Sequence, residues 1–396
     1  MKQGWTYKTL GEIATSMYRG SGIRRDQVTT DGIPCVRYGE IYTTYNISFN
    51  ECVSHTQESL IPNPKYFEHG DLLFAITGES VEDIGKTIAY MGKEKCMLGG
   101  DIICMKHNEN PKYLSYALST PDAIRQKGLG KTKLKVVHTN APSLQSIKIP
   151  LPPLTEQERI VERLDAAFAQ IDELKSNAER QLAEARALFQ SALTQAMQPK
   201  PGWQEKKLKE IGLTQTGTTP SKSDPENYGD FISFIRPAEI DTDGYGNVNY
   251  ESDVSLSEKG LSNGRLFKKH SILMVCIGTI GKVCFTSQDV SCNQQINVLT
   301  PYKEHHFKFI YYAMRNDVFQ KEVIKVAKSA QATLPIINKS KWENLTLFVP
   351  DIEEQQHISS HLDALSSHVR ELEEISRKTA AECDALKQAL LRQIFE

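Results

Sequence analysis

The chain has 396 residues, of which 39% are hydrophobic and 24% are charged, and its mean hydropathy is −0.42. This length predicts two or three domains with hydrophobic cores, and the composition excludes disordered, collagen-like and membrane-embedded proteins. Neither a run of 18 apolar residues nor a secretory signal is visible, so we expect a cytoplasmic protein. The eight cysteines contain no Cys-x-x-Cys pair, which favours free, buried thiols over a zinc or dithiol site.

The net charge of −2 hides a division along the chain. Residues 1–150 carry 18 basic against 15 acidic side chains, and residues 201–349 carry 18 against 16. Residues 151–200 carry 6 against 8, and residues 350–396 carry 5 against 10. We therefore expect any phosphate-binding surface on the two longer segments.

Residues 1–150 predict a mixed α/β domain. Short β-like runs at 33–38, 72–76 and 101–105 alternate with Gly, Pro, Asn and Ser, and a short helix is expected near 111–118. Gly85-Lys86-Thr87 lacks the glycine that a phosphate-binding loop places five residues earlier, where this chain has Ser80. A tight turn that carries one lysine is the preferred interpretation.

Residues 151–198 predict a long helix, because apolar residues recur at alternating steps of four and three. An ordinary domain helix is about a third as long as this segment. We interpret it as one strand of a coiled coil, and the alternative is an amphipathic helix packed on its own domain. The predicted seam of this helix includes Ile160, Leu164, Ile171, Leu174 and Leu188.

Residues 199–349 and 350–396 repeat this plan. Pro152–Asp165 aligns with Pro350–Asp363 at an offset of 198, and the same offset pairs Trp5 with Trp203. The second domain has β-like runs at 231–235, 272–277 and 296–299 and a helix expected near 307–314. The second seam is Ile358, Leu362, Leu365, Val369, Leu372, Leu386 and Leu390. Because the first helix delivers the chain to the second domain, the second helix must return, so the predicted pair is antiparallel, with an approximate twofold axis.

No residue pattern indicates catalysis. Asn63-Pro64-Lys65-Tyr66 and Asn110-Pro111-Lys112-Tyr113 resemble the Asn-Pro-Pro-Tyr of adenine-N6 methyltransferases but have Lys at the third position. No glycine-rich methyl-donor loop follows a clear strand, and no histidine pair has metal-ligand spacing. We therefore interpret both motifs as turns and predict a chain that is not an enzyme, with no catalytic residue, bound cofactor or metal.

DNA binding has more support. Residues 121–141 and 321–341 each carry five basic side chains against one acidic one, at the same place in both copies. A charge run is commonly a solvated face, but phosphate neutralisation needs such clusters. Polar and basic loop side chains can also reach base edges. The predicted DNA-binding residues are Arg19, Arg24, Arg25, Tyr38, Lys86, Lys131, Lys133, Lys135, His138, Ser221, Lys222, Ser223, Arg236, Thr279, Lys282, Asn293, Gln294, Lys328 and Gln331.

The chain resembles the DNA-specificity subunit of Type I restriction-modification systems over essentially its whole length. The likeness rests on Pro152–Gln157 (PPLTEQ) opening a long helix, its second copy at 350–355, and Gly217–Lys222 (GTTPSK) followed by Phe234-Ile235-Arg236. The resemblance implies target-recognition domain 1 at 1–150, a conserved coiled-coil helix at 151–198, target-recognition domain 2 at 199–349 and a second conserved helix at 350–396. Asp351-Ile352-Glu353 departs from the usual helix entry, and the first domain has Arg19-Gly20-Ser21-Gly22 in place of Gly-Thr-Thr-Pro. The two domains are therefore expected to read different half-sites.

The resemblance further implies that each domain reads one half of a bipartite, asymmetric DNA target. Two methyltransferase subunits would then methylate adenine-N6 with S-adenosylmethionine, and restriction subunits would add ATP- and Mg-dependent translocation and cleavage. Two alternatives remain: a non-catalytic two-headed protein scaffold, and a nuclease or methyltransferase with an unrecognised site. The basic stretches count against the scaffold, and the lack of a shared acidic or metal-ligand cluster counts against the enzyme.

Overall fold

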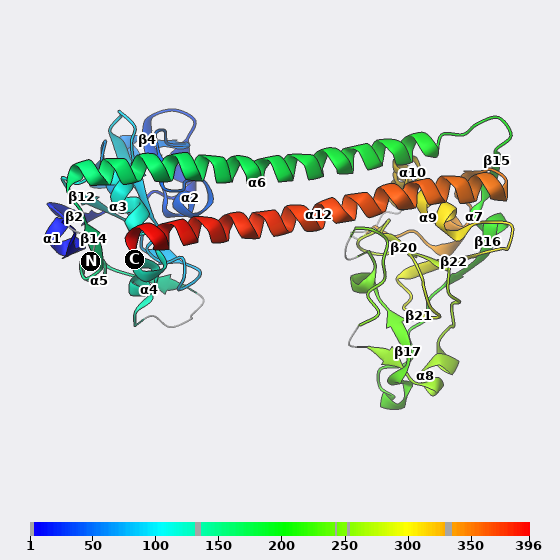
Figure 1. Cartoon of the computed structure of the whole chain (residues 1–396). Coiled ribbons are helices and arrows are strands. Elements are labelled where there is room, and N and C mark those ends of the chain that lie inside the picture. The colour runs from blue at the N-terminus through cyan, green and yellow to red at the C-terminus, as the bar shows by residue number, and fades with distance from the viewer. Residues whose placement is uncertain (1–3, 131–135, 242–243, 252–253, 329–334) are drawn as a thin grey trace. The chain divides into compact units, whose positions relative to one another are not determined.

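The computed structural model describes residues 4–130, 136–241, 244–251, 254–328 and 335–396. The chain forms two compact units, the first made of Met1–Ala178 with Arg377–Glu396 and the second of Glu179–Ser376. Both are mixed α/β, and both contain parts of the long helices α6 (Leu154–Ala196) and α12 (Ile352–Phe395) (Figure 1). Among the described residues, no helix has the length and apolarity that a membrane crossing requires.

The first unit is built on a five-stranded sheet with the order β2-β12-β8-β10-β5. Its strands are β2 (Ser16–Arg19), β12 (Ile102–Lys106), β8 (Leu72–Ala75), β10 (Thr87–Tyr90) and β5 (Ser48–Phe49). A second sheet contains β3 (Val28–Thr29), β6 (Ser54–Thr56), β4 (Ile33–Val36), β11 (Cys96–Leu98) and β7 (Tyr66–Phe67). Two small pairs join β1 (Thr6–Thr9) to β14 (Lys148–Leu151) and β9 (Thr77–Gly78) to β13 (Val137–His138). The helices are α1 (Leu10–Ile13), α2 (Tyr38–Thr43), α3 (Pro111–Ala117), α4 (Pro121–Gly128) and α5 (Ala141–Gln145).

The second unit repeats this topology in a shorter form. Its main sheet has the order β16-β22-β19-β20, formed by β16 (Gly212–Thr216), β22 (Ile296–Pro301), β19 (Ile272–Val275) and β20 (Val283–Phe285). The other strands are β17 (Tyr228–Ile235), β18 (Ser255–Leu256), β21 (Ser291–Cys292), β15 (Gln204–Lys207) and β23 (Thr346–Val349). The helices are α7 (Leu208–Ile211), α8 (Glu258–Asn263), α9 (Phe307–Arg315), α10 (Asp317–Lys328) and α11 (Lys339–Trp342). All six predicted strands and both predicted short helices are present.

The main sheet of each unit is buried on both faces. On β8, Leu72 and Phe74 face the helix-covered core, and Leu73 and Ala75 face the second sheet. β19 divides its side chains between two cores in the same alternating way. Successive strand side chains point to opposite faces, so a strand with two buried faces has a continuous apolar sequence. This burial explains the uninterrupted runs Leu-Leu-Phe-Ala and Ile-Leu-Met-Val.

A buried glutamine ties the start of each long helix to its unit. Gln157 is fully buried, its side-chain oxygen accepts the Asn110 backbone N–H at 3.0 Å, and its amide donates to the Pro152 carbonyl at 2.9 Å. Gln355 accepts from the His306 backbone N–H at 2.8 Å and donates to a proline carbonyl at 2.9 Å. The Gln that ends each Pro-x-x-x-x-Gln motif therefore satisfies the polar groups where strand, loop and helix meet.

A duplicated carboxylate makes the next attachment. Asp165 accepts hydrogen bonds from the Tyr116 hydroxyl at 2.8 Å and from the Lys112 ammonium at 2.7 Å. Asp363 accepts from the Tyr312 hydroxyl at 2.8 Å and from Lys308. Both sets join the long helix to the helix packed on the main sheet, so they hold the helix on its unit.

The long helices run antiparallel within each unit. In the first unit, Lys175 pairs with Asp384 at 3.2 Å, and Asp172, three residues earlier, pairs with Lys387, three residues later. In the second unit, Arg186 pairs with Glu373. Residue numbers that rise along α6 and fall along α12 define opposite directions. The predicted antiparallel pairing is confirmed.

The predicted seam is wrong at three positions. Ile160, Leu164, Ile171, Ile358, Leu362 and Val369 are buried, and Leu365, Leu372 and Leu390 are half-buried. Leu174, Leu188 and Leu386, by contrast, are 55%, 64% and 49% exposed. On α6 the neighbouring positions turn inward instead: Lys175 pairs with Asp384, and the Phe189 ring lies 6.4 Å from that of Tyr312. The helix also packs against its globular part, which draws the buried face away from an ideal two-helix seam.

Candidate nucleic-acid interface

In the first unit, four chain segments meet at one end of the main sheet. The Gly20 N–H donates to the Ile102 carbonyl and the Ser21 N–H to the Leu98 carbonyl, both at 3.0 Å, so the loop after β2 lies against the β11–β12 turn. The Ile76 N–H donates to the Asp101 carbonyl at 3.0 Å, and β9 pairs with β13 alongside. We call residues 19–25, 76–78, 98–101 and 137–138 the first loop edge.

The second unit has the same arrangement. The Gly217 N–H donates to the Ile296 carbonyl at 3.0 Å, and the Thr218 N–H donates to the Cys292 carbonyl at 2.9 Å. The Cys276 N–H donates to the Gln295 carbonyl at 2.8 Å, and an isolated bridge joins Ile277 to Ile336. We call residues 216–223, 276–279, 292–295 and 336–337 the second loop edge. The hydrogen bonds match one to one, so they establish which residues are equivalent.

A glycine is required where each loop leaves its strand. A β-carbon on Gly20 would lie 2.1 Å from the Gly99 carbonyl oxygen, and one on Gly217 would lie 2.1 Å from the Asn293 carbonyl oxygen. Both distances are far inside van der Waals contact. The glycine shared by Arg-Gly-Ser-Gly and Gly-Thr-Thr-Pro therefore lets two backbones approach closely.

The side chains at matched positions of the two loop edges differ in chemistry. Thr219 and Gln294, which are hydrogen-bonded to each other, stand where the first unit has Gly22 and Gly100. The exposed His138, whose Nδ1 lies 3.1 Å from the Thr77 hydroxyl, stands where the second unit has Ile336. The two edges thus share one backbone arrangement and present different hydrogen-bond donors and acceptors.

Several predicted DNA-binding residues lie exposed on the loop edges. Among the described residues, Arg24, Arg25 and Lys222 form no ion pair, so their charges are available to a ligand. The remaining exposed predicted residues on the edges are His138, Ser221, Ser223, Thr279 and Gln294. Lys282 is exposed just after the turn that Gly281 makes at a φ of 92°. Tyr38, the first residue of α2, is 42% exposed.

Other predicted residues are engaged within the chain. Lys86 is a correction: its ammonium donates to the Tyr42 and Tyr45 carbonyls at 3.3 and 2.9 Å, beside the C-terminal end of α2. Asn293 is also a correction, because it is buried and its amide donates to the Gln295 side chain at 2.9 Å.

Two arginines pair with acidic neighbours. Arg19 pairs with Asp101 at 2.6 Å, and Arg236 pairs with the buried Glu239. Each keeps a partly exposed side chain, but less net charge is left for DNA.

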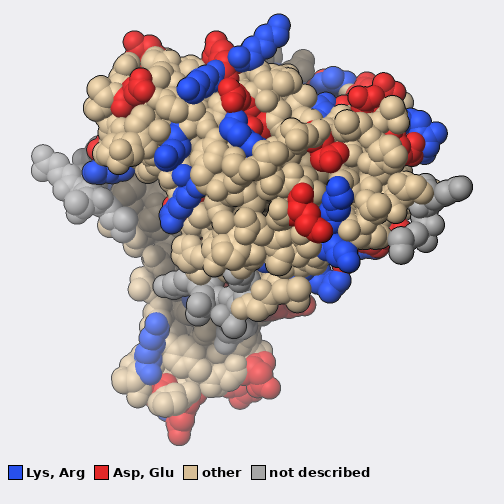
Figure 2. Space-filling model, turned by 90° about the vertical axis from the view of Figure 1, so that its left-hand side faces the viewer, with Lys and Arg blue, Asp and Glu red and all other residues tan. Residues whose placement is uncertain are grey.

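The basic stretch at 121–141 is smaller at the surface than its sequence indicates. Lys127 is buried, and its ammonium donates to the Leu118 carbonyl at 2.8 Å and the Thr87 hydroxyl at 3.0 Å. Burial lowers its pKa to about 7. Lys131, Lys133, Lys135 and Gln331 lie outside the described residues, and of Lys328 the structure describes only the backbone at the end of α10. On the face in Figure 2, basic and acidic side chains are interspersed.

The family model for the Type I restriction modification DNA specificity domain matches residues 2–184 and again residues 200–382. The chain belongs to this family. It is 23% identical over 398 residues to the Type I restriction enzyme EcoBI specificity subunit of Escherichia coli, covering 92% of this chain and 80% of the relative. The HindI specificity subunit of Haemophilus influenzae is 30% identical over 153 residues, which is 38% of this chain and 33% of that subunit.

A solved structure supports the fold. One similar chain comes from a structure described as the structural basis of complex assembly and conformational transition of the type I R-M system. The two chains superpose with a TM-score of 0.79 and 19% sequence identity, over 99% of this chain and 98% of the other. Fold, family and duplicated loop edges agree that this is a non-catalytic specificity subunit that recognises DNA sequence. Within the described residues, no group of three or more His, Cys, Asp and Glu side chains is placed to hold a metal ion.

The eight cysteines of the specificity subunit are free, and seven are buried. Burial raises the pKa of the Cys35 and Cys104 thiols to about 12 in each case. Inert core thiols, as predicted, account for these positions.

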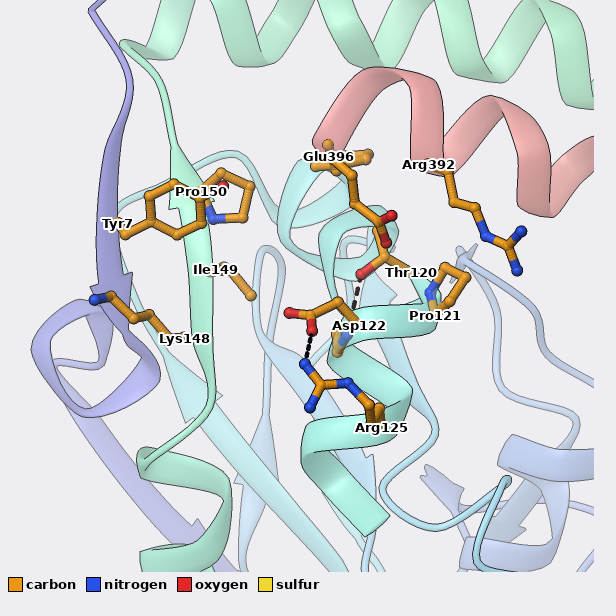
Figure 3. A pocket seen from close by; sticks show the side chains of 12 residues that line it. Tyr7, Thr120, Pro121, Asp122, Arg125, Lys148, Ile149, Pro150, Arg392 and Glu396 are labelled. Atoms are coloured by element: carbon orange, nitrogen blue, oxygen red, sulfur yellow. Dashed lines mark hydrogen bonds and ion pairs between the residues drawn. The ribbon is translucent and has the colours of Figure 1, made fainter. Parts of the chain in front are cut away.

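The first unit of this specificity subunit contains a cavity of about 600 Å³ beside the end of α12 (Figure 3). Asp122 and Arg125 of α4 pair with each other there, Arg392 lies on α12, and Glu396 directly follows that helix. The matching cavity of the second unit, about 380 Å³, has Val318 where the first has Asp122 and is lined mainly by apolar side chains, with Glu322 and Asn344 among the polar ones. The cavity recurs without the charged side chains of the first, so the two units do not share a ligand site there.

Proposed function

We propose that each unit of this specificity subunit reads one half of a bipartite, asymmetric DNA target. One observation carries the proposal: two loop edges with matched backbone hydrogen bonds present different side chains at equivalent positions. Duplication of the scaffold supports a shared task, and divergence of the exposed groups supports two different base sequences.

We further propose that the chain directs partner subunits and binds no cofactor itself. Two methyltransferase subunits would methylate adenine-N6 in each half-site with S-adenosylmethionine, and restriction subunits would cleave unmodified DNA with ATP and Mg. The excess of acidic side chains on the two long helices supports a role in protein contact, because such a surface does not attract phosphate. A cytoplasmic location, where chromosomal DNA is accessible, fits this role.

A single-molecule map of N6-methyladenine tests the proposal. Cells that express this chain with the methyltransferase encoded beside it are compared with cells that express the methyltransferase alone. We expect a bipartite motif only in the presence of this chain, and exchange of residues 1–150 or 199–349 with those of another specificity subunit should change one half of the motif.

The absence of a new motif, although the two proteins co-purify, would refute the proposal. That outcome would favour the alternative of a two-headed protein scaffold.

A further inference from the structure

A short segment that ends with β7 recurs at the same place in the second unit. Asn63-Pro64-Lys65-Tyr66-Phe67 corresponds to Asn263-Gly264-Arg265-Leu266-Phe267. Phe67 pairs with Cys96 of β11, and Phe267 bridges to Val290 just before β21. Three residues after each phenylalanine, the Gly70 N–H donates to the Tyr90 carbonyl at the end of β10 at 2.8 Å, and the His270 N–H donates to the Thr286 carbonyl just after β20 at 2.7 Å. Lys65 and Arg265 are therefore equivalent residues.

This segment lies directly against each loop edge. In the first unit, the Ser21 hydroxyl donates to the Asn63 carbonyl, and the Leu98 N–H donates to the Lys65 carbonyl at 2.8 Å. In the second unit, the Arg265 guanidinium donates to the Thr216 carbonyl at 2.7 Å, one residue before Gly217. Each cation is thus positioned beside the loop that we propose to read DNA.

No acidic side chain in the described part of the chain neutralises the charge of Lys65 or Arg265. Both residues are exposed, and neither forms an ion pair with any of the described residues. The hydrogen bond of Arg265 goes to a neutral carbonyl, so the full positive charge remains. The guanidinium is also held in place, which reduces the entropy lost when it binds a ligand.

The charges close to this position differ between the two units. Lys268 pairs with Asp289 at 2.8 Å in the second unit, and the equivalent residues of the first unit are Glu68 and Lys95. Hydrogen bonding by Lys106 and, more weakly, the charge of Lys95 lower the pKa of Glu68. The two copies therefore carry opposite signs at these positions, and Glu68 forms its ion pair with Lys106, at 2.8 Å.

Position 65/265 is positively charged in both copies, whereas the nearby position 68/268 is acidic in one copy and basic in the other. A cation that has no acidic partner among the described residues, and has the same sign in both copies, supports an external anion common to both units. The acidic residues on a protein surface differ from one protein to another, whereas backbone phosphates are present in DNA of any sequence.

We propose that Lys65 and Arg265 form equivalent phosphate-binding sites in the two units. Each residue binds one backbone phosphate of DNA beside its loop edge. This inference rests on the proposed function, and it adds a sequence-independent contact to the sequence-reading loops. In the first unit, the Lys95 ammonium lies 4.4 Å from the centre of the Tyr66 ring. A cavity of about 350 Å³ is lined there by Lys65 and Lys95, and also by Glu68 and its ion-pair partner Lys106. This cavity gives the phosphate a second cation in that unit.

The salt dependence of DNA binding tests the site. The full chain, co-purified with the adjacent methyltransferase, is titrated with a duplex that carries the mapped motif and with a scrambled duplex at several salt concentrations. Lys65→Ala and Arg265→Ala should each reduce the slope of log K against log salt by about one, and the double variant by about two, on both duplexes. The ratio of affinities for the two duplexes should stay unchanged.

Two variants make the test specific. Lys303→Ala removes an exposed lysine just beyond the opposite end of β22 and should leave the slope at its wild-type value. Arg265→Lys keeps the charge and should retain most of the slope, which separates charge from a structural effect of the Thr216 hydrogen bond.

A wild-type slope in the Lys65→Ala and Arg265→Ala proteins would overturn the phosphate site while leaving the proposed function intact. Loss of the methyltransferase from these variants at an unchanged slope would also overturn it, because the cations would then face a protein. If the wild-type complex bound neither duplex, the proposed function itself would fail.

Discussion

Replacement of Gly20 by alanine should separate two backbones that the first loop edge holds together. The new β-carbon would lie 2.1 Å from the Gly99 carbonyl oxygen and 2.5 Å from the Leu98 carbonyl oxygen. Ordinary contact begins near 3.4 Å, so the loop must move by about 1 Å. That movement breaks the bonds from Gly20 to Ile102 and from Ser21 to Leu98, both 3.0 Å long.

Two lost backbone hydrogen bonds, each worth about 1 kcal/mol net, give a destabilisation of about 2 kcal/mol. For a unit of this size we expect a fall in Tm of about 4–8 °C in the transition of the first unit. Scanning calorimetry measures this fall. In the methylation map, Gly20→Ala should weaken recognition of one half of the motif only, and Gly217→Ala should weaken the other half.

Gly22→Ala is the matched control, two residues along the same loop. Its β-carbon would meet no atom within 4 Å, and Gly22 is outside the set of positive-φ residues, so this variant should be neutral or slightly more stable. Equal Tm values for Gly20→Ala and Gly22→Ala would refute the reasoning, because the close approach would then have no energetic consequence.

Four further substitutions test other parts of the structure. Asp165→Asn should destabilise the first unit by about 1–3 kcal/mol through loss of a charged hydrogen-bond acceptor, and Asp363→Asn should do the same to the second unit, as separate calorimetric transitions will show. Burial lowers the pKa of His305 and His306 below the usual 6.5, so the unfolded state binds more protons than the folded state at acidic pH. The stability to urea should therefore fall as the pH drops below 6.5, and it should fall less in His305→Gln. The pKa of Lys127 is about 7 in the folded state and 10.5 when unfolded, so the stability of the wild type rises as the pH increases across that range. Any gain in unfolding free energy from Lys127→Met should be largest at or below pH 7 and shrink towards pH 10.

Each of these predictions has a result that would contradict it. A fall in both calorimetric transitions after one aspartate substitution would mean that the attachment is not local to its unit. An identical acid limb in His305→Gln would mean that this imidazole is solvated when folded. A difference between wild type and Lys127→Met that is constant from pH 6 to 10 would mean that the buried ammonium keeps an ordinary pKa.

Much of the fold was predictable because it depends on local pattern and on duplication. The apolar runs of β8 and β19 and the four-three periodicity of α6 and α12 follow directly from residue order. The helix seam was less predictable. Leu188 fits the heptad yet is 64% exposed, since globular parts compete with the partner helix for the buried face.

The candidate site was only partly predictable. Loop cations such as Arg24 and Lys222 are exposed as expected, whereas Lys86 is engaged by carbonyls and Lys127 is buried. The sequence shows that a residue is lysine, but it does not show whether the ammonium group is exposed to water or buried against a helix end. Burial and hydrogen bonding, which decide the difference, involve residues as distant in sequence as Thr87 from Lys127.

The sequence by itself determined the duplicated plan, the two long helices and the family, because periodicity and repeated motifs are properties of residue order. Only the tertiary structure decided which residues of the loops and short strands are equivalent in the two copies. Position 65 matches 265 at an offset of 200, while the helices match at 198, and insertions hide such correspondences from a simple alignment. Backbone hydrogen bonds between distant strands reveal them, because a strand position is defined by its partners rather than by its number.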